Sequence, residues 1–541
     1  MRKFLFIFAF FFVVLPIRAT DLYIAQTATG GSTGADCGDA LPYTFFNNSA
    51  NWPSPIGPGT TVHICGTITA PAGASGFLTF QGSGVSGNPI TLKFENGAVL
   101  TAPYFSGSGA ISINGKNYIT IDGNSLQGTI ENTLSGTSGA TCLGGPCAYQ
   151  PEYSYGIYCV TGGNNLIIQN LNIIDMYVMN SVTDNNGQSS YGVNCGNGSN
   201  ISISGMVIHD VKWAISTGQG GGTWAGYQIS GNTIYNVDHG IFFNITGGTQ
   251  NGPVNIFGND IQTGTTWDNT ANANHHDHIH ISGNPAGSSG SPNIPNPIYV
   301  YNNYLHGDPG ANGNAYFYSF PGNPSPYTGG IYYFNNLVVN TSTTHFTAGG
   351  MMWCFTPVCY SYNNTFVAVA NGHSSAGPNG AAMGGVGSIH ENNIISGLSV
   401  GVSFMNEGHQ TSDYNDYWQC CGASPAMSSL GYNQGTFYES LASWRSGTGY
   451  DSHSIGGNPG LNSGSAPPYQ LSSGSAAIGA GTNLTGVCSG QPNPGLGALC
   501  SDRTGNPRPV TGAWDAGAYQ SGGVTGDQPA PATGLTATVQ P

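Results

Sequence analysis

The chain has 541 residues, among them 85 glycines, yet only 6% are charged and the formal net charge is −15 at pH 7. Three of the nine Lys and Arg residues lie in a predicted leader, which leaves Lys93, Lys116, Lys212, Arg445, Arg503 and Arg508 against 24 acidic residues. So few cations exclude the phosphate-neutralising surface that nucleic-acid binding requires, and they exclude attachment to anionic membranes for the same reason.

Residues 1–19 have the three parts of a secretory signal. Arg2 and Lys3 form a basic start, Phe4–Val14 is apolar, and small Ala19 precedes an expected cleavage site before Thr20. The apolar run is too short for a membrane span, and no later segment approaches a spanning length, so no membrane insertion is predicted. The alternative is a short buried N-terminal element. The signal predicts a secreted, extracellular or cell-surface protein.

The mature chain carries twelve cysteines, an even number that favours disulfides in an exported protein. Sequence alone leaves the connectivity open. Short separations favour Cys142–Cys147, Cys354–Cys359 and Cys488–Cys500, while Cys37–Cys65 and a vicinal Cys420–Cys421 pair are also plausible. Cys159 and Cys195 occupy the same strand position in what we take to be successive coils, so we expect them to be bonded or in contact in the core.

Residues 20–100 are predicted to form an N-terminal cap and entry coils, and a short repeat dominates residues 101–420. Each unit has alternating apolar residues, a Gly-Asn or Asn-Asn turn, and apolar residues again. The second turn residue falls at Asn232, Asn259, Asn303, Asn336, Asn364 and Asn393, at spacings of 27, 44, 33, 28 and 29 residues. Such a period indicates a solenoid of β-coils, since a propeller blade needs about 40 or more residues. Asn suits the turn because it tolerates the left-handed conformation and its amides can stack in hydrogen-bonded rows.

This pattern resembles the pectin-lyase-like superfamily of right-handed parallel β-helices over roughly residues 100–420. The segments starting at Ser440, Ser475, Asp502 and Trp514 are similar to the closing region of a narrower group of secreted bacterial β-helix proteins. The resemblance implies an all-β, right-handed parallel β-helix with a C-terminal closing segment over 421–521, and it carries no particular activity. Residues 522–541 are predicted to form a disordered tail.

A second strand accompanies each Asn turn, and its copies can be aligned. The inward positions are Ile157, Val193, Ile215, Ile241, Ile279, Phe317, Met352 and Val402. Alternation then predicts two outward columns. One contains Gly156, Gly192, Ala214, Gly240, His278, Tyr316, Met351 and Gly401, and the other contains Tyr158, Asn194, Ser216, Phe242, His280, Tyr318, Trp353 and Ser403.

The alignment predicts a glycan-binding groove on the outer face. His278 and His280 are its candidate catalytic groups, and its candidate sugar-stacking residues are Tyr158, Phe242, Tyr316, Tyr318 and Trp353. Aromatic faces for stacking, beside polar groups that orient hydroxyls, are typical of sugar sites. The alternative is that these are ordinary sheet-surface aromatics, favoured by β-propensity.

The histidine-rich strand also contains Asp277, which is predicted to orient a ring or bind a cation. Alternation places His276, His278 and His280 on one face, with His275 and Asp277 on the other unless the strand bends. His276 and Asp277 are the candidate metal ligands, with calcium or zinc as possible ions. Lys212 and Asp238 align with His276 two coils and one coil earlier, and Lys212 is a further catalytic candidate.

A Lys or His base beside a cation-holding acid is similar to the arrangement in β-helix polysaccharide lyases, whereas no Asp pair matches the β-helix polygalacturonases. The first hypothesis is therefore a secreted protein that binds or degrades an extracellular polysaccharide, as a lyase or glycoside hydrolase. The alternatives are a histidine-rich strand without chemistry, and a non-catalytic adhesin, matrix or filament component that self-associates end to end.

Overall fold

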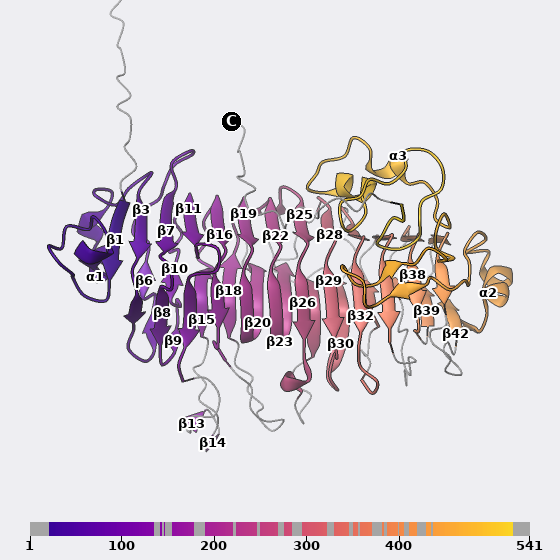
Figure 1. The fold of residues 1–541 in the computed structure, drawn as a ribbon, viewed down its shortest axis with the longest axis horizontal. Coiled ribbons are helices and arrows are strands. Elements are labelled where there is room, and N and C mark those ends of the chain that lie inside the picture. The colour runs from indigo at the N-terminus through magenta and orange to yellow at the C-terminus, as the bar shows by residue number, and fades with distance from the viewer. Residues whose placement is uncertain are drawn as a thin grey trace, which may run out of the picture.

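The computed structural model describes residues 21–134, 141–142, 145–146, 154–177, 190–219, 223–245, 249–268, 275–283, 295–321, 329–345, 350–354, 358–369, 381–383, 387–398, 400–404, 410–418, 429–433 and 436–522. These residues form the predicted right-handed parallel β-helix, an elongated solenoid in which successive coils stack along one axis (Figure 1). The coils have three sheet faces, and the apolar core fills the space between them.

The first face is a fourteen-stranded parallel sheet. Its strands, in spatial order, are β2 (Leu41–Pro42), β1 (Asp21–Ala25), β3 (Thr61–Ile64), β7 (Ile90–Phe94), β11 (Ile119–Asp122), β16 (Leu166–Gln169), β19 (Ile201–Ser204), β22 (Tyr227–Ser230), β25 (Val254–Phe257), β28 (Ile298–Tyr301), β31 (Ile331–Phe334), β34 (Cys359–Tyr362), β37 (Ile389–Glu391) and β40 (Thr411–Asp413).

The second and third faces merge because two long strands, β20 (Val207–Gln219) and β23 (Thr233–Ile245), run through the bend between them. The second face also contains β4 (Thr67–Thr69), β8 (Val99–Ala102), β12 (Thr129–Asn132), β17 (Asn172–Ile174), β26 (Asp260–Thr263), β29 (Tyr304–Gly307), β32 (Leu337–Asn340), β35 (Thr365–Ala368), β38 (Ile394–Ser396) and β41 (Asp416–Trp418).

The third face carries the candidate site. Its further strands are β6 (Leu78–Thr79), β10 (Ile111–Ser112), β15 (Tyr155–Cys159), β18 (Tyr191–Gly196), β27 (His276–Gly283), β30 (Gly313–Pro321), β33 (Met352–Cys354), β36 (Ala381–Met383), β39 (Val400–Phe404) and β42 (Ser429–Asn433). Strand β36 forms a coil that the sequence alignment passed over between Met352 and Val402.

The predicted asparagine row forms between the first and second faces. Each Nδ2 donates to the Oδ1 of the next coil at 2.9–3.0 Å, from Asn232 through Asn259, Asn303, Asn336 and Asn364 to Asn393. Each backbone N–H donates to the same oxygen, and Asn415 extends the row by one coil. The left-handed residue is the one before each ladder Asn, such as Asn335 at φ 54°, rather than the ladder Asn itself.

The inward column is confirmed. Strand pairing aligns Ile157, Val193, Ile215, Ile241, Ile279, Phe317 and Met352, and all of them are buried in the core. Cys159 and Cys195 extend this register with a Cα–Cα distance of 4.3 Å and form the predicted disulfide. The side chain of Val402 is outside the described part of the structure.

Three more predicted disulfides are present, Cys37–Cys65, Cys354–Cys359 and Cys488–Cys500. The predicted Cys142–Cys147 and Cys420–Cys421 pairs involve residues outside the described ranges, as do the leader and nearly all of the predicted tail. Among the described residues, no helix has the length and apolar character needed to span a membrane.

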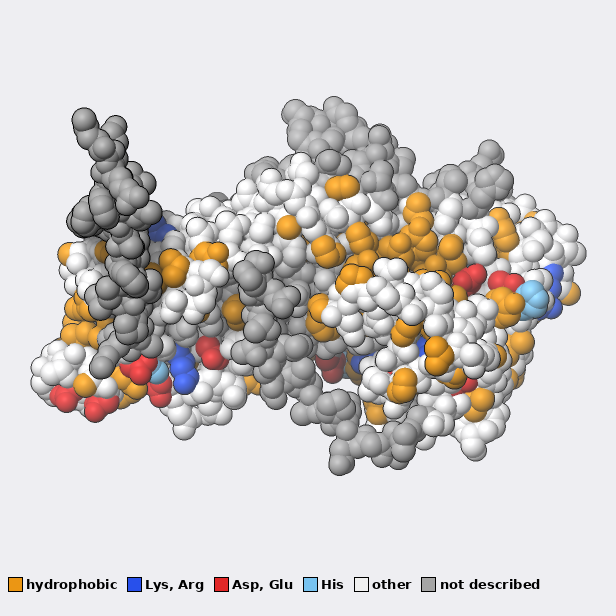
Figure 2. Space-filling view, turned by 90° about the horizontal axis from the view of Figure 1, so that it is seen from above, with side chains coloured by type: hydrophobic (Ala, Val, Ile, Leu, Met, Phe, Trp, Pro, Cys, Tyr) orange, Lys and Arg blue, Asp and Glu red, His pale blue; other side chains and the backbone are white. Residues whose placement is uncertain are grey.

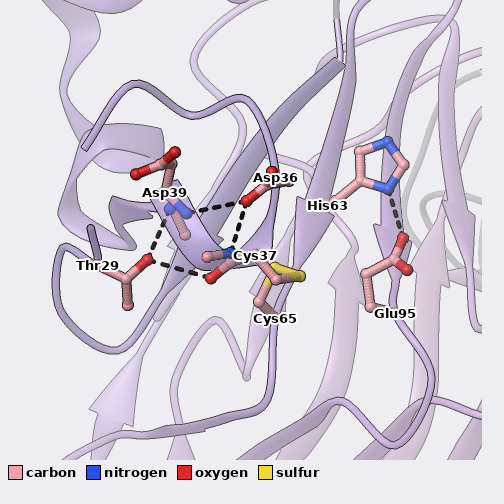
Figure 3. The surroundings of a disulfide bond; sticks show 9 residues. Thr29, Asp36, Cys37, Asp39, His63, Cys65 and Glu95 are labelled. Atoms are coloured by element: carbon pink, nitrogen blue, oxygen red, sulfur yellow. Dashed lines mark hydrogen bonds and ion pairs between the residues drawn. A yellow bond between two sulfur atoms is a disulfide. The ribbon is translucent and has the colours of Figure 1, made fainter. Parts of the chain in front are cut away.

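The N-terminal end is covered by α1 (Thr44–Asn47) and the short turns η1 (Cys37–Asp39) and η2 (Ser49–Asn51). The Cys37–Cys65 disulfide ties η1 to the residue after β3, and Asp36 accepts hydrogen bonds from the backbone of Gly38 and Asp39 (Figure 3). On β3 itself, His63 Nδ1 lies 2.6 Å from Oε1 of Glu95, the residue that follows the neighbouring strand β7.

At the other end, antiparallel β43 (Thr436–Tyr438) and α2 (Leu441–Thr448) cover the last coil, with Trp444 buried. The chain then doubles back along the helix through β44 (Leu461–Asn462), β45 (Gln470–Leu471), α3 (Thr485–Cys488) and η4 (Leu496–Cys500) (Figure 1). Leu499 and Trp514 pack on first-face aromatics such as Tyr301 and Phe334. Figure 2 shows hydrophobic side chains gathered beside this segment and few charged ones on that side.

The asparagine ladder predicts a large stability effect for Asn336→Ala. Asn303 donates to Asn336 Oδ1 from both its backbone and its amide, so the truncation leaves two buried donors without an acceptor. We expect a loss of about 2 kcal/mol or more in the free energy of unfolding, measured by urea denaturation. Ser202→Ala, on the outward side of β19, is the control and should change stability by less than about 0.5 kcal/mol. Equal effects of the two substitutions would contradict a structural role for the ladder.

His390 predicts a loss of stability in acid. Its side chain is buried on β37, and burial lowers its pKa to about 3. In the unfolded chain the pKa of this imidazole is about 6.5, so between pH 6.5 and 3 His390 takes up a proton when the protein unfolds. The contribution of the neutral ring to stability is therefore complete above pH 6.5 and is lost as the pH falls toward 3, by at most about 1.4 kcal/mol per pH unit. His390→Gln should therefore lose less stability than the unmodified protein between pH 7.5 and 5.5. An unchanged pH dependence in His390→Gln would refute the assignment.

Candidate functional site

Two columns of side chains cover the outside of the third face. Strand pairing aligns the first as Tyr155, Tyr191, Trp213, His239, Asp277 and Ala315, and the second as Tyr158, Asn194, Ser216, Phe242, His280, Tyr318 and Trp353. The second column is the predicted one. The first was not predicted, and it lies three residues before the second in each strand rather than two.

The predicted outward column at His278 and Tyr316 is wrong, because it faces the interior. The exposed fractions of these side chains are 1% and 0%. A ring nitrogen of His278 lies 3.0 Å from the backbone oxygen of His306, its ring stacks on Tyr316 at 4.2 Å, and the Tyr316 hydroxyl donates to Gly307. Neither side chain is placed to touch a ligand on the outer face, so their catalytic and sugar-binding roles are not supported.

The physical reason is the bend between the second and third faces. Strand pairing skips this position in each coil, so two consecutive residues point inward and simple alternation fails. A Cβ added at Gly240 would meet the core side chain of Ile261 at 2.5 Å, which places this column directly against the second face. Glycine or alanine fits there in the earlier coils, whereas His278 and Tyr316 fill the corner in theirs.

The same bend brings together residues that alternation had separated. Three imidazole nitrogens surround one carboxylate oxygen, Asp277 Oδ2, and they belong to His275 (Nδ1, 2.9 Å), His280 (Nδ1, 3.0 Å) and His239 (Nε2, 3.5 Å). We call these four residues the histidine cluster. His275, His280 and Asp277 come from one coil, and His239 lies directly beneath Asp277 on the preceding coil.

A chain of hydrogen bonds orients the cluster from behind. His239 Nδ1 pairs with Asp238 Oδ2 at 2.8 Å, and Asp238 Oδ1 pairs with His276 Nδ1 at 2.7 Å. His276 Nε2 reaches Asp268 Oδ1 at 3.1 Å. His276, the predicted metal ligand, therefore has both ring nitrogens occupied by carboxylates and supports His239 through Asp238. The other predicted ligand, Asp277, lies at the centre of the cluster.

The second oxygen of Asp277 is also fixed. Asp277 Oδ1 accepts hydrogen bonds from Asn314 Nδ2 at 3.1 Å and from the backbone of Ala315 at 3.0 Å. Lys212 is buried, with an exposed fraction of 6%, at the position of Asp238 one coil earlier, as the alignment predicted.

The cluster concentrates charge in a chain that has little of it. Burial would raise the pKa of Asp277, but His239, His275 and His280 hold it well below its usual range. Burial alone would lower the pKa of His239, but Asp238 and Asp277 raise it to about 9. For His280 burial dominates, and its pKa is lowered despite Asp277.

Aromatic rings adjoin the cluster along the helix axis. On the N-terminal side, Trp213 stacks on His239 at 4.4 Å with an interplanar angle of 4°, and Tyr191 follows at 5.9 Å from Trp213. On the C-terminal side, His280 meets the edge of Tyr318 at 4.7 Å, and Tyr318 meets Trp353 at 5.3 Å. Three of the predicted sugar-stacking residues, Tyr158, Tyr318 and Trp353, are half-buried on this face, and Phe242 is 8% exposed.

Sequence reasoning missed His239, His275 and Trp213 as site residues. The signal available was the column that starts at Tyr155, in which aromatic residues precede His239 and Asp277 at the same strand position. Recognising that column as outward requires knowing where each strand bends.

Comparison with solved structures yields distant likenesses. Pectate lyase Pel9A matches with 13% identity and a TM-score of 0.42, over 93% of this chain and 97% of its own. A GH136 lacto-N-biosidase from Eubacterium ramulus matches with 9% identity and a TM-score of 0.39, over 74% and 67%. A rhamnogalacturonan lyase matches with 13% identity and a TM-score of 0.37, over 66% and 84%.

These likenesses extend no further than the β-helix fold. No protein-family model matches the chain, and no curated protein matches it. The case for a function therefore rests on the residues of the third face.

His278 and His280, which strict alternation places on the same face, should differ in how much their replacement by alanine lowers the free energy of unfolding. His278→Ala removes a buried ring that packs on Tyr316, so we expect a loss of about 2 kcal/mol or more in the free energy of unfolding. His280 is 7% exposed but lies on the outer side of the third face beside Asp277, so His280→Ala opens no cavity in the apolar core and should cost less than His278→Ala. Thermal or urea denaturation of both variants measures the difference. A larger loss in His280→Ala would contradict the inward placement of His278.

Proposed function

We propose that this chain is a secreted polysaccharide-active enzyme that binds an extracellular glycan along its third face. The aromatic columns are its sugar-binding surface, and the histidine cluster is its reactive centre. Tyr158, Phe242, Tyr318 and Trp353 keep the sugar-stacking role expected from the sequence, and Trp213 and Tyr191 join them.

The observation that carries the proposal is the placement of the histidine cluster, in which three residues are buried and His275 is exposed, between aromatic rings on one outer face. The aromatic rows extend from β15 to β33, which at about 4.8 Å per coil is roughly 29 Å. That length accommodates several sugar rings of a linear chain. Rings that stack on sugars, beside a few oriented polar groups, are the usual composition of glycan sites.

The character of the cluster favours a lyase-type reaction over hydrolysis by a carboxylate pair. A glycosidase of that kind needs two accessible carboxylates about 5–9.5 Å apart. Among the described residues of the cluster and its support, Asp238 is enclosed by His239 and His276, and Asp268 is paired with His276 on the far side of that ring. Asp277 is therefore the one carboxylate at the centre. Imidazoles beside a single carboxylate suit proton abstraction next to a sugar carboxyl group.

Secretion is supported by the basic and apolar leader and by the disulfides, which are typical of oxidising compartments. The non-catalytic rod is less well supported. Antiparallel β43 and α2 cover one end of the helix and α1 the other, and covered ends work against end-to-end assembly of coils.

The proposal is tested with the mature protein and a panel of neutral and uronate-containing polysaccharides. Binding is measured by affinity electrophoresis, and elimination by the ultraviolet absorbance of unsaturated sugar products. Trp213→Ala and Trp353→Ala should weaken binding, whereas His280→Ala should reduce the rate by about 10²-fold or more. Tyr332→Ala, which removes a stacked aromatic from the first face, is the matched control and should change neither. Absence of binding and cleavage across the panel would refute the proposal.

A further inference from the structure

The four ligand-type atoms of the histidine cluster have the spacing of an ion site. His239 Nε2, His275 Nδ1, His280 Nδ1 and an oxygen of Asp277 all lie within 4.8 Å of one another. Zinc held tetrahedrally at about 2.0–2.2 Å from each ligand sets neighbouring ligand atoms about 3.3–3.6 Å apart. The observed N–O distances of 2.9–3.5 Å are close to this range.

Three of these four atoms make no hydrogen bond of ordinary geometry. Asp277 Oδ2, His239 Nε2 and His280 Nδ1 are buried, and their close contacts are the ion-pair distances to one another, without a hydrogen bond of ordinary geometry. The exposed fractions of the three residues are 0%, 3% and 7%. A buried polar atom without a partner is costly, and here three of them point at one place. A cation at that place would satisfy all three.

The surroundings match those of protein metal sites. A ligating histidine normally gives its other ring N–H to a carboxylate or carbonyl, and ligating carboxylates are themselves hydrogen-bonded. His239 pairs through Nδ1 with Asp238, which leaves Nε2 directed at the cluster. Asp277 is held through Oδ1 by Asn314 and Ala315, which leaves Oδ2 directed at the same point.

We propose that His239, His275, Asp277 and His280 bind a divalent transition-metal ion of the zinc class. Three imidazole nitrogens and one carboxylate oxygen suit zinc, whereas calcium and magnesium take oxygen ligands almost throughout. The His275 side chain is 52% exposed, so one side of the ion faces solvent. With its imidazoles bound to an ion, the cluster would act on a bound sugar through the positive charge of that ion, which can meet a carboxylate or hydroxyl of the sugar, and not through a free imidazole base. That charge would lie on a face of a chain poor in Lys and Arg.

A second group of metal-ligand-type residues differs from the histidine cluster in its hydrogen bonding. Asp175, His209 and Asp210 also lie close together. However, His209 Nδ1 is already paired with one oxygen of Asp210, and Asn236 donates to the other. This group has its own hydrogen bonds, and we assign no ion to it.

The test is direct measurement of zinc on the purified mature protein, without sugar. After dialysis against EDTA and then zinc, mass spectrometry of the metal content should give one zinc per chain, and cobalt substitution should give the visible spectrum of a four-coordinate Co²⁺ site. Asp277→Asn and His280→Ala should lower zinc affinity at least about tenfold, while His453→Ala, which removes an exposed histidine–carboxylate pair elsewhere, should retain it. Circular dichroism checks that each variant is folded. His275→Ala, which removes the exposed ligand of the cluster, should also lower zinc affinity and keeps the test valid if Asp277→Asn does not fold.

The outcomes separate this inference from the proposed function. No zinc in the unmodified protein, or undiminished affinity in a folded His280→Ala variant, would overturn the metal site. Zinc binding that depends on the cluster, together with no glycan binding, would uphold the metal site and refute the glycan function. Glycan cleavage by a protein that binds no zinc would refute the metal site and uphold the glycan function.

Discussion

Hydrogen bonding between successive coils in strict register is the constraint on which this structure depends. Each strand pairs with the same strand of the next coil, so a given position recurs about every 4.8 Å along the axis. The asparagine ladder fixes that register at one corner, because each amide donates to the next coil through its side chain and accepts from the previous one. The coils vary in length, from 22 residues between Asn393 and Asn415 to 44 between Asn259 and Asn303, without disturbing the stack.

The ladder and the core column were predictable because both repeat at every coil and therefore leave a periodic trace in the sequence. An Asn at a turn and an isoleucine at a strand centre recur whatever the length of the intervening loop. The disulfide between Cys159 and Cys195 could be predicted for the same reason, since two residues in one column of adjacent coils are necessarily neighbours. The sequence alignment missed the coil of β36, because that short strand lacks the bulky centre of its neighbours.

The site was predicted only in part, because it depends on one local departure from alternation. At the bend into the third face two consecutive residues point inward, which moves His278 into the core and Asp277 out of it. Strict alternation along the strand predicted the correct strand and the correct outward column for Phe242, His280, Tyr318 and Trp353. It placed Tyr316 on the outer side, whereas Tyr316 faces the interior. A position filled by glycine in several coils was the available clue, since a Cβ at Gly156 or Gly192 would collide with core isoleucines.

The histidine cluster is a product of coil stacking more than of loop structure. Asp277 meets His239 because the two are paired across adjacent coils, and His280 reaches the same oxygen because the bend brings positions three residues apart to one side. The supporting pair, Asp238 and His276, occupies adjacent coils in the same way. The ladder that secures the register lies at a different corner, between the first and second faces. The asparagines can therefore hold two coils together while substitutions on the third face alter the chemistry there. This separation lets one rigid scaffold carry a polar, charged centre in a chain in which only 6% of the residues are charged.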